Sequence, residues 1–176
     1  MRTICKDPSL INSVIGFMAG GDTALIKAIE GFEDHPEYAE RQMAELGFKE
    51  GDLLIATTEG GETSWVIGTA EYASSKSTNT PWFLYCNPDD ILIANIERSR
   101  RVLQNPKINK MNLTTGQQGL SGSTRMQAST ILMYAVGLAL LSYIEKIDLK
   151  AEIINMKELL ENTDYSFLEK TIAMES

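Results

Sequence analysis

The hydrophobic residues of the chain fall into short runs that end at glycine, asparagine or hydroxyl-rich segments. Four runs have the length of a strand, the last of them weaker than the others: residues 14–19, 53–58, 82–86 and 107–113. Short apolar runs bounded by turn residues are typical of buried strands. We therefore predict four strands, each followed by a polar turn.

Between these runs the apolar residues recur at helical spacing. The pattern predicts helices over residues 24–29, 36–46, 64–73, 91–103 and 124–144, and two more within 150–176 that are separated near Asn162. The helix over 124–144 is apolar almost all round in its second half, which is typical of a centrally packed helix. Alternation of strands and helices predicts an α/β fold with a mostly parallel sheet covered on both faces.

Composition narrows the function classes. The 176 residues are 43% hydrophobic and carry a formal net charge of −8, as in an ordinary globular protein. No basic cluster is longer than residues 98–101, which argues against nucleic acid as a partner. The apolar run 131–141 is shorter than the roughly 20 residues of a membrane span, so we expect no membrane contact.

Cysteine and histidine are too few for several common kinds of site. Cys5 and Cys86 lie far apart, and His35 is the single histidine. This pattern indicates a reduced, cytoplasmic location. It also argues against a histidine-based metal site or a Ser-His-Asp triad, and we expect neither a metal nor a cofactor.

Two strand-to-helix loops carry groups that suit an anion. The first contains Gly60, Gly61, Thr63 and Ser64, where glycines allow close approach of the backbone and N–H groups begin a helix. Without a ligand the same residues would form a tight turn with a helix cap, and Glu59 and Glu62 argue against a phosphate directly at this loop.

The second loop precedes the long helix. Its donors are three hydroxyls and one guanidinium, from Ser121, Ser123, Thr124 and Arg125. All four stand at a helix start, where the dipole also favours an anion. The alternative is a serine-rich cap beside a solvated arginine.

A third candidate is the acidic segment around Glu33. A carboxylate that faces a ligand pocket can act as general base or hold sugar hydroxyls. Acidic residues at a helix end are also commonly just solvated, so this segment alone leaves both interpretations open.

Several stretches match the motifs of one family. Residues 19–34 resemble the pattern AGG-x-x-A followed by VEGAED, and residues 52–73 resemble the region around ASGRTPYV. GLSGSTRM at 119–126 is similar to a TGSTRMK box, and Asn87-Pro88 to a CNP turn. Together these stretches resemble the sugar isomerase (SIS) domain proteins of the N-acetylmuramic acid 6-phosphate etherase and glucokinase regulatory protein type. The resemblance covers roughly residues 10–145.

This resemblance implies a flavodoxin-like parallel sheet flanked by helices that binds a phosphosugar at the strand ends. It implies an SIS domain over 1–148 and a helical extension over 149–176. In the etherases the reaction eliminates D-lactate from N-acetylmuramic acid 6-phosphate and then adds water. Glu33 matches one of the two acid/base glutamates, which makes it the catalytic candidate. Gly60, Gly61, Thr63, Ser64 and the four donors of the second loop are the candidates for phosphosugar binding.

The chain also departs from the family pattern. The family's other glutamate, its first phosphate loop and its first strand precede the matching region. We therefore expect an edge beside residues 53–58 that is either exposed or covered by a partner, such as a second copy in a homodimer or a second SIS lobe. The serine and arginine of ASGRT are replaced by Gly60 and Glu62.

These departures favour a regulatory or sensing domain that binds a hexose or N-acetylhexosamine 6-phosphate. One alternative is an etherase-like lyase, and another is an interaction scaffold with a degenerate sugar site.

Overall fold

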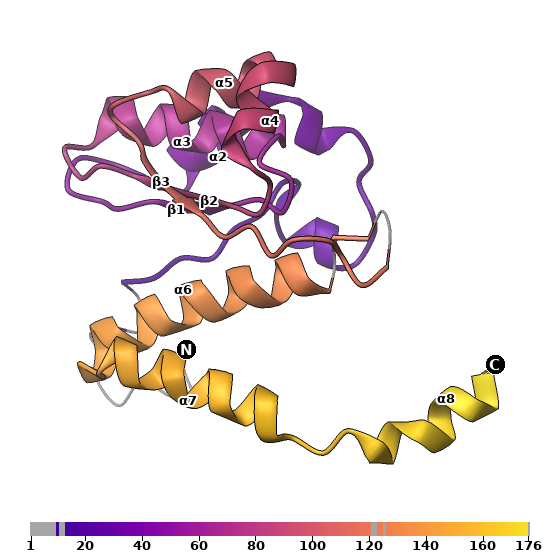
Figure 1. The fold of residues 1–176 in the computed structure, drawn as a ribbon. Helices are drawn as coiled ribbons and strands as arrows, with labels where there is room; N and C mark the ends of the chain where they lie inside the picture. Colours follow the sequence, from indigo (N-terminus) through magenta and orange to yellow (C-terminus); the bar gives the residue numbers. More distant parts are fainter. Residues whose placement is uncertain (1–9, 11–12, 121–122, 125, 176) are drawn as a thin grey trace. The chain divides into compact units, whose positions relative to one another are not determined.

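The computed structural model describes residues 10, 13–120, 123–124 and 126–175 (Figure 1). The chain divides into two compact units, Met1–Val136 and Gly137–Ser176. The sheet and the helices that cover it belong to the first unit.

The sheet has three parallel strands within the described residues. They are β1 (Ile55–Thr57), β2 (Trp82–Tyr85) and β3 (Asn109–Asn112), in the order β1-β2-β3. The α/β class and three of the four predicted strands are thus confirmed.

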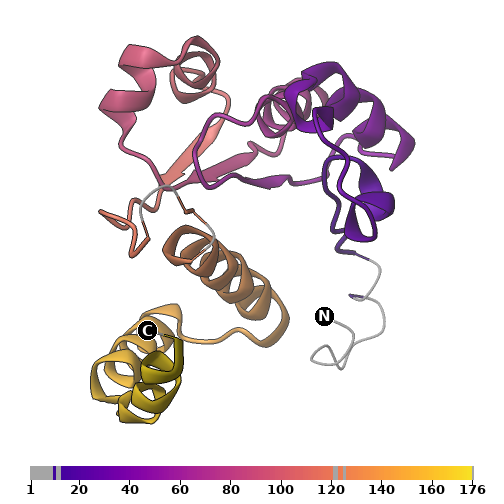
Figure 2. The ribbon, with the colours of Figure 1, turned by 90° about the vertical axis from the view of Figure 1, so that its right-hand side faces the viewer.

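Helices cover both faces of this sheet (Figures 1 and 2). One face carries α2 (Pro36–Glu45), α3 (Ser64–Lys76), α4 (Asp89–Asn95) and α5 (Glu97–Leu103). The other face carries the first turns of α6 (Gln127–Glu145). The layered arrangement predicted from the alternating pattern is therefore present.

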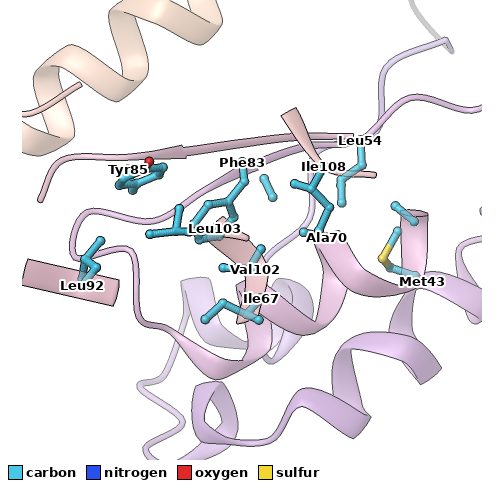
Figure 3. Close-up of a cluster of buried hydrophobic side chains, with 12 residues drawn as sticks. Met43, Leu54, Ile67, Ala70, Phe83, Tyr85, Leu92, Val102, Leu103 and Ile108 are labelled. Carbon is cyan, nitrogen blue, oxygen red and sulfur yellow. The ribbon is translucent and has the colours of Figure 1, made fainter. Parts of the chain in front are cut away.

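Alternate residues of β2 supply the two halves of the core. Phe83 and Tyr85 are fully buried among side chains of α2, α3, α4 and α5 (Figure 3). Leu84, between them, points to the opposite face and packs with Ala128 and Leu132 of α6. This period of two is the ordinary consequence of the strand pleat.

β1 is an edge of the described sheet. Leu54 accepts a hydrogen bond from Trp82 N (2.9 Å) and Thr58 N donates to Leu84 O (3.0 Å), so alternate residues of β1 face β2. The N–H and C=O groups of Ile55 and Thr57 consequently face the other way. In the described part of the chain nothing pairs with them, as expected for the edge beside residues 53–58.

The predicted strand over 14–19 is wrong. Residues 14–18 are neither helix nor strand, and Ile15 is 60% exposed. The carbonyl of Met18 instead accepts hydrogen bonds from Gly21 N and from Gln42 Nε2, each at 2.9 Å. Since these bonds come from a turn and a helix side chain, that carbonyl has no role in a ladder.

The helices also differ from prediction in places. The helix predicted over 24–29 is wrong: the 3₁₀ turn η1 (Gly21–Leu25) ends at the second residue of this range, residues 26–29 are not helical, and a second 3₁₀ turn, η2 (Phe32–Asp34), follows. The helix over 91–103 is divided at Ile96, whose backbone is extended. Arg100 stabilises this division, because its Nε donates to Ile93 O (2.6 Å) and its Nη2 to Ala94 O (3.1 Å).

The prediction of a centrally packed helix is wrong for α6. By length and composition α6 could cross a membrane. Only 11% of its apolar stretch is buried in the described structure, whereas a centrally packed helix would be mostly buried. Its buried residues, Ala128 and Leu132, lie in the first turns, where the sheet is within reach.

The second unit contains the end of α6, α7 (Leu149–Asn162), η3 (Ser166–Leu168) and α8 (Glu169–Glu175). Asp148 caps α7, since its side chain accepts from Lys150 N and Ala151 N. The helix pair predicted over 150–176, with its break after Asn162, is confirmed within the described residues.

Candidate functional site

A cavity of about 320 Å³ opens at the carboxyl end of β1. This is the edge of a parallel sheet at which ligands commonly bind. Its lining residues come from the segment before η1, from the link between η1 and η2, from η2, and from the end of β1 through the following loop to the start of α3: Phe17, Met18, Ala19, Ile29, Glu33, Thr57, Thr58, Glu59, Thr63, Trp65 and Val66. Of the residues predicted for the site, Glu33 and Thr63 line this cavity.

The loop from Glu59 to Ser64, which contains Gly60 and Gly61, is held by three side chains that we call the carbonyl clamp. Each donates a hydrogen bond to one of three successive carbonyls: Asn87 Nδ2 to Gly60 O (3.1 Å), Ser99 Oγ to Gly61 O (2.8 Å) and Arg98 Nε to Glu62 O (2.5 Å). The clamp was not foreseen from sequence, because its members lie 27 to 38 residues away along the chain.

The clamp also orients the N–H groups of the loop. In a trans peptide the N–H points opposite to the preceding carbonyl, and the described chain has no cis peptide. The N–H groups of Gly61, Glu62 and Thr63 therefore point away from the clamp. They have no hydrogen-bond partner among the described residues. Three adjacent free donors before a helix start are a suitable site for an oxyanion.

Gly61 is required here by packing as well as by backbone conformation. Its φ is +78°, and an added Cβ would lie 2.8 Å from Leu92 Cδ1 and 3.2 Å from Tyr85 Cβ. Gly60 meets only the side chain of Glu62 within the same loop. The two glycines therefore have different roles, which the sequence pattern did not separate.

Thr63 and Ser64 lie where the loop enters α3. Thr63 Oγ1 is 3.0 Å from Thr58 Oγ1, and it makes no capping hydrogen bond to α3. The first amides of α3 consequently stay without a side-chain cap. Ser64 is the first residue of the helix, and the side-chain cap of the alternative, ligand-free interpretation is absent at Thr63.

The charge of Glu62 is opposed by a nearby guanidinium. Arg98 Nη2 lies 3.7 Å from Glu62 Oε2, and both side chains are close to half exposed. Glu62 therefore has a cation beside it, which lessens its repulsion of a bound anion.

A second carboxylate of the cavity, Glu59, was not predicted as a site residue. Ser129 Oγ donates to Glu59 Oε1 at 2.6 Å. This hydrogen bond joins the first turn of α6, just after the second predicted loop, to a lining residue of the cavity at the end of β1. The position of Glu59 directly after a strand was the signal that could have identified it.

Ser123 and Thr124 are described at the end of the second loop. Ser123 N donates to Leu120 O (3.0 Å), and Thr124 O accepts from Ser129 N (3.2 Å). Their hydroxyls have no hydrogen-bond partner among the described residues. Ser121 and Arg125, the other candidates of this loop, lie outside the described residues.

Burial changes the ionisation of two residues behind the site. Burial raises the pKa of Tyr85, and the hydrogen bond that Tyr85 donates to Asp89 (2.7 Å) adds to the rise. Burial raises the pKa of the Cys86 thiol, and the charge of Glu59 adds to it. Neither group is poised as an acid or base near neutral pH. The described residues also contain no group of three or more His, Cys, Asp or Glu that could hold a metal.

Comparison with known proteins points to one activity by name. No family model matches the chain. It is 38% identical over 117 residues to the N-acetylmuramic acid 6-phosphate etherase of Rhodopirellula baltica, a match that covers 66% of this chain and 35% of the relative. It is 34% identical over 128 residues to the etherase of Streptomyces avermitilis (73% and 36%) and 36% identical over 119 residues to that of Bacillus mycoides (68% and 36%). The chain thus spans about a third of the length of these relatives.

Proposed function

We propose that this chain carries part of a phosphosugar site that acts on N-acetylmuramic acid 6-phosphate as an etherase-type lyase, within an SIS-like, flavodoxin-like fold in the cytoplasm. The observation that carries the proposal is the placement of Glu33 in a cavity that adjoins a loop with three free N–H groups. The names of the relatives favour the lyase over the regulatory interpretation.

The phosphate would be bound by the free backbone donors of Gly61, Glu62 and Thr63 and by the start of α3 at Ser64. Ser121, Ser123, Thr124 and Arg125 would supply the remaining donors from the start of α6. The Ser129–Glu59 hydrogen bond supports this division of roles, since it brings the two loops together.

The sugar would extend from the phosphate into the cavity, where Glu33 is available. Glu33 has no hydrogen bond or ion pair with any described residue. In the proposed reaction a base takes a proton from the carbon next to the ether carbon, the carbon–oxygen bond breaks, and the departing lactate oxygen gains a proton. Water then adds across the double bond. Glu33 would carry one of these protons.

The test is incubation of the chain with N-acetylmuramic acid 6-phosphate and assay of released D-lactate. Glu33→Gln should lower the rate by about 10²–10⁴-fold, the usual contribution of a general acid or base. Glu40→Gln is the matched control, because Glu40 is exposed on α2 and has no partner among the described residues. Equal rates for the two variants would contradict the role of Glu33.

The second candidate function is binding without turnover, as in a regulatory or sensing domain. One observation favours it: the position of the family's arginine holds Glu62, paired at 3.7 Å with Arg98. Calorimetric binding of a hexose or N-acetylhexosamine 6-phosphate without lactate release would support this candidate. Both candidate functions are compatible with a homodimer or a second lobe that covers the edge of β1. Light scattering of the chain tests for the homodimer.

A further inference from the structure

α7 carries a row of apolar side chains along one side. Leu149, Ile153, Met156 and Leu160 follow one another at intervals of four, three and four residues. Alternating steps of three and four keep these side chains on one stripe of a helix. This heptad spacing is typical of the apolar seam between two helices of a coiled coil. The 14 residues of α7 hold two such heptads.

No described part of the chain buries this stripe. Leu149 is 42% exposed, Ile153 54% and Leu160 56%, and α7 has no buried residue. An isolated helix of this length is marginal in water, because most helical stability in proteins comes from packing of an apolar face. A partner that covers the stripe would therefore stabilise α7.

The charges beside the stripe fit a second copy of this chain. At 3.6 residues per turn, Lys150 and Lys157 lie along one border of the stripe and Glu152 along the other. In a parallel pair of helices, a residue on one border faces the opposite border of the partner five positions further along. Glu152 of each copy then faces Lys157 of the other, and two-fold symmetry repeats the contact.

Lys157 is accessible to such a partner. Its Nζ lies 3.7 Å from Glu161 Oε1 on the same helix, and the two side chains are 71% and 61% exposed. A surface ion pair of this kind contributes little to stability, so it does not hold Lys157 away from a second copy.

The same charges disfavour an antiparallel pair. In that orientation equal borders face each other, so Lys150 of one copy would lie beside Lys157 of the other, and like charges in contact are destabilising. The seam residues agree with a parallel dimer, since a β-branched residue such as Ile153 at one seam position with leucine at the other favours two strands.

We propose that two copies of this chain associate through α7 as a short parallel coiled coil. Leu149, Ile153, Met156 and Leu160 form its seam, and Glu152 pairs with Lys157 of the second copy. This interface is separate from the edge of β1 and does not depend on the phosphosugar function. Two heptads should bury less than the roughly 1,200 Å² of a standard interface, so we expect a reversible dimer whose population rises with concentration.

Sedimentation equilibrium over a range of chain concentrations tests the seam. Ile153→Lys should raise the dissociation constant more than about tenfold, because it buries a charge in the seam. Asn155→Lys is the matched control, since it adds the same charge on the exposed opposite side of α7, and it should leave the dissociation constant unchanged. If another part of the chain covers the stripe, the unaltered chain stays monomeric at every concentration, which overturns the proposal.

Charge reversal tests the partner's identity. Lys157→Glu should weaken the dimer about three- to tenfold, because Glu152 then faces a glutamate. Adding Glu152→Lys should restore the dimer, since the pair is then reversed. Loss of the Lys157–Glu161 contact cannot explain such a rescue, because that contact stays broken in the double variant. A dimer that is insensitive to both changes uses another surface and contradicts the proposal.

Cross-linking tests the orientation. In a parallel pair the two copies of residue 149 are neighbours, whereas in an antiparallel pair they lie at opposite ends of a helix about 20 Å long. In a background of Cys5→Ser and Cys86→Ala, Leu149→Cys should therefore form a disulfide-linked dimer on mild oxidation. Asn155→Cys is the control and should not. A dimer that persists without cross-linking at 149 would rule out the parallel arrangement.

Discussion

The two loops predicted to hold an anion are built differently. In the first, Gly61 packs against Leu92, and the three carbonyls from Gly60 to Glu62 are each bound by a distant side chain. In the second, an added Cβ at Gly116 or Gly119 would meet nothing within 4 Å. Packing against the core thus requires the glycine at position 61 of the first loop. In the second loop, only the local backbone conformation could require a glycine.

This difference indicates where function and stability are coupled. In the proposed site the first loop binds through N–H groups whose direction depends on the clamp, so changes in the clamp should affect both stability and binding. The second loop is proposed to bind through hydroxyls and a guanidinium, so changes there should affect binding alone. Four predictions test this comparison, in order of decreasing effect.

Gly61→Ala should destabilise the chain by about 2–4 kcal/mol, since it combines a left-handed backbone with a contact of 2.8 Å to Leu92. Urea unfolding measures the free energy. Gly119→Ala is the matched control in the second loop and should cost less than about 0.5 kcal/mol. Similar costs for the two variants would remove the contrast between the loops.

Arg125→Ala should weaken phosphosugar binding by about 1.5–3 kcal/mol, the range for hydrogen bonds to charged groups. Calorimetry with glucose 6-phosphate measures this effect, and urea unfolding should show an unchanged stability. Affinity equal to that of the unaltered chain would place the phosphate at the first loop alone.

Ser99→Ala should lower the free energy of unfolding by about 1–3 kcal/mol, because it leaves the buried Gly61 carbonyl without its donor. It should also weaken phosphate binding. The peptide group between Gly61 and Glu62 then loses the hydrogen bond to its carbonyl, so the direction of the Glu62 N–H is no longer fixed. Ser75→Ala, on the exposed side of α3, is the control and should do neither. A stable variant with normal binding would show that the clamp does not orient the loop.

The smallest effect concerns pH. The pKa of Cys86 is raised in the folded chain by burial and by Glu59, so the protonated thiol stabilises the fold. That stabilisation is complete below the unfolded pKa of about 8.5 and is lost as pH rises through the folded pKa.

Between pH 7 and pH 10 the unaltered chain should therefore lose more stability than Cys86→Ala, as measured by urea unfolding at both pH values. Glu59→Gln should lessen this loss. A larger loss for Cys86→Ala than for the unaltered chain would show that burial of the thiol does not favour its protonated form.

The site was only partly predictable from sequence. Glu33 and Thr63 were identified before the structure and line the cavity, whereas Glu59 and Trp65 were not. From the sequence alone, a glutamate beside glycines is interpreted as solvated and a tryptophan in a helix as part of the core. Neither pattern reveals an unpaired Nε1, since that depends on which residues surround it.

The sequence by itself determined the α/β class, the three paired strands and the positions of the two loops that we propose as anion sites, because period and turn residues act over a few neighbouring positions. Tertiary structure alone decided that residues 14–18 form no strand. It also decided in which direction the loop N–H groups point and which residue donates a hydrogen bond to Glu59. Each of these depends on hydrogen bonds between residues 24 to 70 positions apart. Such contacts leave no periodic trace in the chain, since any compatible donor at the right place in space can make them.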